Sequence, residues 1–196
     1  MPIIGDEDII SARIAAENDA SIYKLSSAMI SRDMYQFERR EFPPYFSIVI
    51  PESFDELAPE YAKIKFPYEE RPSIIMSNND TTVNIVFDCM TVQPESLQER
   101  LDKYQAVIKK IHPNYVFFSN GIYNLNNDSN LAYYDYRGNA LDADIYYICF
   151  FTDLPSGELF GCFSCPSESQ SDWEPYARKM IQTIEQLIPD SDNNGR

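Results

Sequence analysis

Two neighbouring apolar runs, residues 144–152 and 158–165, are the clearest feature of the hydrophobic pattern. Both are rich in β-branched and aromatic side chains and have the length of strands. Pro155 and Gly157 lie between them and supply the fixed φ and the positive φ that tight turns use, so the pattern predicts a hairpin. In the first run alternate residues are apolar on both faces, and we therefore expect this hairpin to be covered on both sides.

Shorter apolar or alternating runs predict further strands. Turn-forming residues recur about every ten positions in the second half of the chain, which favours an antiparallel meander over β-α-β units. The segment 53–57 has the residues of a single helical turn. The predicted strands cover residues 45–51, 62–66, 74–76, 82–88, 115–118, 122–125 and 131–137, with a break at 119–121,.

Two segments have the periodicity of amphipathic helices. Residues 94–111 begin with Pro94 in the first turn and carry one apolar stripe, and residues 171–188, led by Trp173, carry a broader one,. We expect these two helices to cover opposite faces of the sheet. Residues 6–34 have a narrow apolar stripe that predicts one long or two shorter helices, docked on the domain or on a second copy of the chain,. Pro43 and its neighbour Pro44 mark residues 36–44 as a linker,.

These elements predict an α+β fold. The expected architecture is a three-layer α/β/α domain with a mostly antiparallel sheet of about six or seven strands, plus an N-terminal helical extension. The predicted division is an extension and linker at residues 1–40, the α+β domain at 41–189 and a disordered tail at 190–196.

The chain is strongly acidic, which narrows the classes of partner. Its 16 Lys and Arg residues against 31 Asp and Glu residues give a net charge of −15, which argues against nucleic acid or an anionic membrane as partner and permits a basic protein,. No apolar run is long enough to span a bilayer, and the amino terminus is acidic where a secretory signal would be basic, so we expect a cytoplasmic protein. All four cysteines lie in strand-like runs, which suits reduced, buried thiols,.

None of the chemical motifs in the sequence completes a reactive site. His112 is the only histidine and lies at a helix end, where a structural role is expected,. Cys162 and Cys165 have metal or redox spacing, but residues three apart in a strand face opposite sides, and two ligands do not make a zinc site. The loop 126–130 resembles the start of a calcium loop without its glycine and closing glutamate. We therefore assign no catalytic residue, no metal ligand and no cofactor, and we favour a non-enzymatic role.

One stretch has an unusual composition. Residues 114–169 contain seven acidic residues against the single basic Arg137, and they hold seven of the 14 tyrosines. Tyrosine offers contact area at a low entropic cost and carboxylates attract a basic partner, so this pattern predicts a docking surface. The competing interpretation is that the tyrosines simply pack the sheet. The residues assigned to the surface are Tyr133, Asp135, Tyr136, Asp142, Asp144 and Tyr146.

The order of elements resembles the PsbP-like superfamily, which includes the extrinsic photosystem II subunit, a small Ran-binding import factor and bacterial DcrB-type domains. The resemblance covers residues 45–188 and rests on a strand that ends in Pro51 and is followed by Phe54, a middle helix, four antiparallel strands and a closing helix led by Trp173. It implies a sheet with helices on both faces and a non-enzymatic role in binding or assembling proteins. Residues 6–34 have no counterpart, and exported members carry leaders that are not seen here.

We expect a cytoplasmic protein-binding or assembly module, adaptor or chaperone-like, that binds a basic partner through the acidic, Tyr-rich surface. The first alternative is a hydrolase with carboxylates in a cleft. The second is a homodimeric scaffold tied by the helices of residues 6–34.

Overall fold

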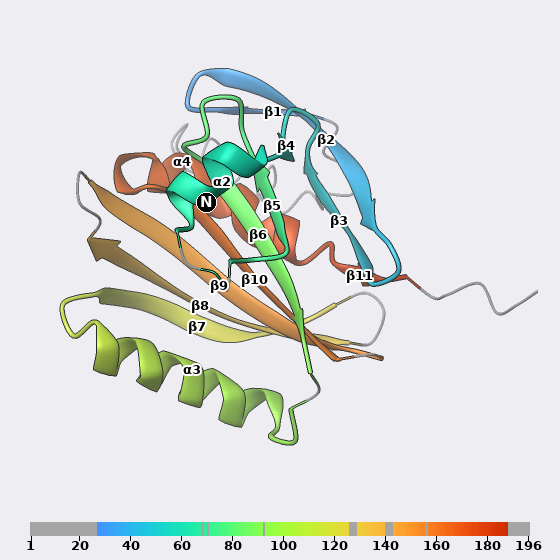
Figure 1. Ribbon diagram of the computed structural model, residues 1–196, viewed down its shortest axis with the longest axis vertical. Coiled ribbons are helices and arrows are strands. Elements are labelled where there is room, and N and C mark those ends of the chain that lie inside the picture. The colour runs from blue at the N-terminus through green and yellow to red at the C-terminus, as the bar shows by residue number, and fades with distance from the viewer. Residues whose placement is uncertain are drawn as a thin grey trace, which may run out of the picture.

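The computed structural model describes residues 27–67, 69, 71–91, 93–125, 129–139, 143–155 and 157–187. These residues form two antiparallel sheets and the helices that cover them (Figure 1). The larger sheet has seven strands in the order β4-β5-β6-β10-β9-β8-β7. The strands are β4 (Asp55–Glu56), β5 (Ile74–Ser77), β6 (Asn84–Met90), β7 (Val116–Asn124), β8 (Asn130–Asn139), β9 (Asp144–Leu154) and β10 (Gly157–Pro166).

The smaller sheet has four strands in the order β1-β2-β3-β11. It contains strands from both ends of the described chain, because β11 pairs with β3. Its strands are β1 (Ser27–Ile30), β2 (Asp33–Phe42), β3 (Phe46–Pro51) and β11 (Glu185–Gln186), and the helices are α2 (Pro59–Lys65), α3 (Leu97–Ile111), the 3₁₀ turn η2 (Ser167–Ser169) and α4 (Gln170–Ile181).

The two faces of the seven-stranded sheet are covered by different helices, as predicted. On one face Leu101 of α3 packs with Tyr134 and Phe151. On the other face Ile148 packs with Met180 of α4, and β3 adds further apolar side chains to the same cluster. Figure 1 shows α3 along the strands at one end of the first face and α2 over β5 and β6 at the other end, with α4 and the smaller sheet on the second face. Each large apolar side chain buried in this way stabilises the fold by about 1.5–3 kcal/mol.

The predicted hairpin of β9 and β10 is confirmed. Its strands pair without interruption from Leu154↔Gly157 to Ile145↔Pro166, which leaves two residues for the turn. The helix α3 is also confirmed, and a capping box at Ser96 and Glu99 closes its first turn,. The capping box follows from local chemistry that the sequence displays directly. The positive φ expected at Gly157 was wrong, because Gly157 is the first residue of β10, paired with Leu154, and no described glycine has a positive φ.

The prediction for residues 27–42 was wrong. The helix expected up to residue 34 and the linker expected from residue 36 are instead β1 and β2, with a cis peptide between Pro43 and Pro44 before β3. The strand forms because alternate side chains of β2 pack on α4: the Tyr35 ring lies 5.0 Å from that of Trp173. The rest of the expected N-terminal helix and the predicted tail at 190–196 lie outside the described residues.

Three smaller boundaries also differ from the prediction. Residues 62–66, expected as a strand, lie in or directly after α2, because Pro59 at its first turn and Lys63 and Lys65 in its last turn favour a helix,. Residues 53–57 contain the short strand β4 rather than a helical turn. The last helix ends at Ile181 rather than 188, because the chain turns there to pair β11 with β3.

In the described part of the chain, no helix has the length and apolar character needed to cross a membrane.

Candidate functional site

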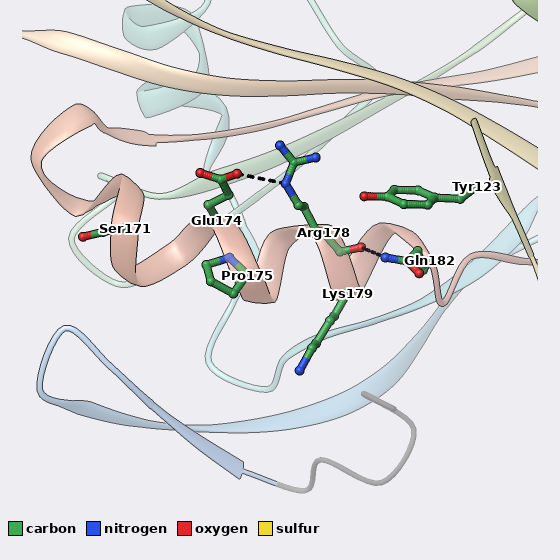
Figure 2. A pocket seen from close by; sticks show the side chains of 7 residues that line it. All are labelled: Tyr123, Ser171, Glu174, Pro175, Arg178, Lys179 and Gln182. Atoms are coloured by element: carbon green, nitrogen blue, oxygen red, sulfur yellow. Dashed lines mark hydrogen bonds and ion pairs between the residues drawn. The ribbon is translucent and has the colours of Figure 1, made fainter. Parts of the chain in front are cut away.

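A surface pocket lies between helix α4 and strand β7, at one edge of the seven-stranded sheet (Figure 2). Its volume is about 410 Å³. Tyr123 contributes from β7, and the opposite wall comes from α4 and the turn that follows it. The lining residues are Tyr123, Ser171, Glu174, Pro175, Arg178, Lys179 and Gln182.

Arg178 connects the pocket to the interior of the domain. Its Nε donates to Glu174 Oε1 at 3.0 Å, one turn earlier on α4, as Figure 2 shows. Its second terminal nitrogen donates to Asp135 Oδ2 at 2.7 Å and to Ser119 Oγ at 2.9 Å. Burial opposes the charge of Arg178, but a hydrogen bond with Tyr123 and the nearby Asp135 carboxylate together raise its pKa,. The guanidinium is therefore a fixed positive charge beneath the pocket.

Asp135 holds an irregularity in the edge strand. Its carboxylate accepts hydrogen bonds from the backbone N–H of Ser119 at 2.6 Å, from Ser119 Oγ at 2.8 Å and from the Tyr146 hydroxyl at 2.7 Å. The pairing of β7 with β8 shifts register at this point, between Phe117 and Asn120, so Ser119 is part of a β-bulge,. The predicted break at 119–121 was therefore wrong. The strand β7 continues through these residues with a bulge, which the buried carboxylate of Asp135 stabilises.

The predicted docking residues occupy different environments. Tyr133 is half-buried and stacks on Tyr123 with ring centroids 4.5 Å apart, and the Arg178 guanidinium lies 5.0 Å from its ring. Asp135 and Tyr146 are fully buried, and burial followed by the hydrogen bond to Asp135 raises the pKa of Tyr146. The structure therefore brings Tyr133, Asp135 and Tyr146 together around Arg178.

The other three predicted residues lie elsewhere. Tyr136 is buried on the α3 face, where it stacks on Tyr147 at 5.0 Å. Asp144 is exposed and accepts a hydrogen bond from Asn139 at 2.7 Å, and Asp142 lies outside the described residues. Because Asp135, Tyr136 and Tyr146 present almost no surface, the six residues do not form one exposed face. A binding role for them stays a prediction, and for the three buried ones it can only be indirect.

The sequence does not single out Arg178, Ser119 or Tyr123. Glu174 and Arg178 have the i, i+4 spacing of a helical ion pair, but that spacing gives no sign that the guanidinium points toward the sheet,. Asp135 lies 43 positions before Arg178, so their contact depends on how the helix packs. The only sequence signal was the position of Arg178 next to Ala177 on the apolar side of the predicted helix.

The outer edge of β7 is the second component of the site. β7 is the last strand of the seven-stranded sheet, and no strand of the described residues pairs with its outer side. It contains no charged residue and no proline, the usual devices that protect an edge, although its bulge interrupts the first half,. After the bulge, residues 120–124 pair regularly with β8, and we call their outer side the β7 edge. Exposed apolar side chains of this strand are Val116 at 43%, Phe118 at 48% and Ile122 at 41%.

A separate charged cluster lies under α3. Arg100 is buried and donates to Glu158 Oε2 at 2.6 Å and to Asp153 Oδ1 at 2.7 Å, while the Tyr104 hydroxyl donates to Glu158 Oε1 at 2.8 Å. Burial raises the pKa of Glu158, although these donors act against the shift. Both carboxylates are occupied by the arginine, so the cluster ties α3 to the β9–β10 hairpin. No three His, Cys, Asp or Glu side chains gather to hold a metal ion within the ranges the structure describes.

No protein-family model and no curated protein matches the sequence. The solution structure of cyanobacterial PsbP (CyanoP) from Synechocystis sp. PCC 6803 matches with a TM-score of 0.55 and 6% identity, over 80% of this chain and 95% of that one. The Pseudomonas aeruginosa protein PA94, of unknown function, matches with a TM-score of 0.46 and 12% identity, over 80% and 99% of the two chains. The immunity protein TplEi of the T6SS from Pseudomonas aeruginosa, complexed with a peptide, matches with a TM-score of 0.43 and 13% identity, over 95% and 65%.

The match to cyanobacterial PsbP concerns the fold alone, because only 6% of the aligned residues are identical. It agrees with the resemblance drawn from the strand that ends in Pro51 and from the closing helix led by Trp173. The structure has two antiparallel sheets, with a middle helix and a closing helix on opposite faces of the larger one. Together with this structural match, the arrangement shows that the chain has a PsbP-like fold.

Proposed function

We propose that the chain is a protein-binding module that takes up an extended segment of a partner protein along the β7 edge. The observation that carries this proposal is the open, uncharged edge at residues 120–124 with Ile122 exposed beside it. An edge strand offers unpaired N–H and C=O groups, and a partner strand that adds to it gains main-chain hydrogen bonds.

The pocket beside the edge supplies a means of selection. An added strand places alternate side chains on the two faces of the sheet, and the face toward α4 leads to the pocket beside Tyr123,. Glu174 and Gln182 give that pocket a polar wall, so it suits a polar side chain of the partner. The net charge of −15 favours encounter with a basic partner through long-range attraction,.

The buried network fixes the shape of the edge before binding. Asp135 holds the bulge through Ser119, and Arg178 holds Asp135 from the helix side. A strand whose conformation is fixed in advance loses less entropy when a partner binds. In this proposal Asp135, Tyr133 and Tyr146 act by positioning β7, and the partner contacts residues 120–124 and the pocket.

The experiment is selection of binding peptides from a random displayed library with the full chain, followed by fluorescence anisotropy with a selected peptide. The variant Ile122→Lys places a charge on the edge and should weaken peptide binding at least about tenfold. The matched control is Ile64→Lys, because Ile64 is 76% exposed on α2 and undergoes the same change of side chain and charge. Hydrogen exchange of the amides of residues 120–124 should slow when the peptide binds.

Three outcomes would contradict the proposal. The library could give no peptide above background, or the selected peptides could bind Ile122→Lys as well as the wild type. A third is a concentration-dependent dimer in light scattering that Ile122→Lys dissociates, which would assign the edge to a second copy of the chain instead.

A further inference from the structure

Cys149 and Cys162 lie directly opposite each other on the two central strands of the larger sheet. Cys149 belongs to β9 and Cys162 to β10, and the two residues are paired in the register. Their sulfur atoms are 3.2 Å apart, and both are free thiols. No step of the proposed partner binding uses this pair.

The position of the pair in the hairpin suits a disulfide. In a hairpin with a two-residue turn, the closing pair, here Leu154 and Gly157, is hydrogen-bonded, and bonded and non-bonded pairs then alternate along the strands,. Counting back from the turn places Cys149 and Cys162 in a non-hydrogen-bonded pair, the class whose side chains approach most closely. A disulfide needs a sulfur separation of about 2.05 Å, so the sulfurs must move together by only about 1 Å.

The surroundings distinguish the two sulfurs. Cys149 is buried among aromatic residues, with its sulfur 4.0 Å from the Tyr136 hydroxyl. Cys162 is half-buried. It packs against the apolar residues under α3 and also against those under α2, so it lies where the part of the sheet covered by α3 meets the part covered by α2. A hydrogen bond with Cys162, and then those with the hydroxyls of Tyr134 and Tyr136, lower the pKa of Cys149, although burial acts against them. The hydrogen bond between the two sulfurs, together with burial, raises the pKa of Cys162.

The remaining cysteines lack this arrangement. Cys165 lies on the opposite face of β10, where burial raises the pKa of its thiol to about 12. Cys89 is exposed on β6, and partial burial followed by the charge of Asp88 raises its pKa. Each of these two provides a comparison within the same chain.

We propose that Cys149 and Cys162 form a thiol-oxidation site in which hydrogen peroxide converts the pair into a reversible disulfide. One sulfur of the pair, as its thiolate, attacks one peroxide oxygen, the O–O bond breaks, and the departing hydroxide takes up a proton to leave water and a sulfenic acid. The other sulfur then attacks the sulfenic acid sulfur, the S–O bond breaks, and the departing hydroxide takes the proton of the attacking thiol to form a second water. Two thiols and one peroxide thus give one disulfide and two waters. A dithiol reverses the reaction by exchange.

The test treats the folded full-length protein with hydrogen peroxide and then blocks the remaining thiols with an alkylating reagent. Peptide mapping without reduction should recover a Cys149–Cys162 cross-link with the mass of two hydrogen atoms missing, and dithiothreitol should restore both thiols. Cys149→Ser and Cys162→Ser should each abolish the cross-link. Cys89→Ser should leave the cross-link unchanged, and thermal unfolding confirms that each variant is folded.

The proposal is overturned if Cys149 and Cys162 are both alkylated after peroxide treatment that has oxidised Cys89. It is also overturned if cross-links join Cys89 to another cysteine while the pair stays reduced, or if the Cys149–Cys162 link resists dithiothreitol in the folded protein. Failure of the peptide-binding experiment would leave this result untouched, because the two sites share no residue.

Discussion

Replacing Asp135 by alanine tests whether the buried network holds the edge of the sheet. The carboxylate accepts hydrogen bonds from Ser119, Tyr146 and Arg178, and its side chain is 1% exposed. The substitution leaves these donors facing a cavity, and it leaves the Arg178 charge, 18% exposed, without its inner partner. Breaking a buried ion pair by removing one member costs about 3–5 kcal/mol, and partial exposure of Arg178 reduces this, so we expect a loss of about 3–4 kcal/mol.

Urea unfolding followed by the fluorescence of Trp173 measures this loss. Trp173 is the only tryptophan, is 2% exposed and packs against Phe163 in the main core, so its signal reports loss of the fold. Asp144→Ala is the matched control, because Asp144 is exposed and its nearest cation, the Arg137 guanidinium, is 3.7 Å away. The control should change the free energy of unfolding by less than about 1 kcal/mol.

Asp135→Asn separates charge from shape. The amide oxygen can still accept from Ser119, whereas the amide nitrogen faces the Tyr146 hydroxyl and Arg178 and cannot accept from either. We expect a loss of about 2 kcal/mol for this variant, and a smaller further loss when Arg178→Met is added than in the wild type. A loss below about 1 kcal/mol for Asp135→Ala, or full additivity of the two substitutions, would refute the reasoning.

Two further predictions concern close packing and alkaline stability. Gly157→Ala would place a Cβ atom 2.1 Å from the backbone oxygen of Met90, so chemical unfolding should show a loss of about 3 kcal/mol, against less than about 1 kcal/mol for Gly121→Ala, whose Cβ meets only the movable ring of Tyr133,. A loss of similar size in both variants would contradict this. Burial raises the pKa of seven tyrosines and most strongly that of five, to about 12 for Tyr104. Above pH 10.0 the unfolded chain therefore releases protons that the native chain keeps, and stability falls by at most about 1.4 kcal/mol per pH unit for each of the five,. Tyrosinate absorbance should therefore rise together with loss of the fold, and a gradual rise in an intact protein would argue against it. The five tyrosines are Tyr104, Tyr134, Tyr136, Tyr146 and Tyr147.

Much of the fold could be predicted from residues that act locally. Pro155 marks the turn of the β9–β10 hairpin, and Leu97, Leu101 and Tyr104 at helical spacing mark α3. The face of each helix follows from its apolar stripe, so the placement of α3 and α4 on opposite sides could also be predicted,. In β2 the signal was weaker, because Arg39 and Arg40 interrupt the alternation that Tyr35 and Phe37 begin.

The candidate site could be predicted only in part, because its contacts join distant segments. Tyr133, Asp135 and Tyr146 were identified by composition, yet composition carries no information on which side chains face inward. The role of Arg178 becomes visible only when α4 packs on the sheet, since its charge is then matched by Asp135,. Whether the outer edge of β7 is unpaired depends on the order of the strands in the sheet. The alternation of apolar and polar residues within one strand carries no information on that order.

The pairing of β11 with β3 sets an order of events during synthesis. Phe46 and Ile50 lie in the same hydrophobic cluster as Met180 and Ile184, so this cluster cannot be completed until more than half of the chain has been synthesised after β3. At the usual rates of translation that interval is about 10 s, in which the first hairpins leave the ribosome with apolar surface uncovered. The short strand β11 therefore completes the smaller sheet. A chain cut before Glu185 would leave one edge of β3 unpaired, and strands of other molecules could pair with that edge,.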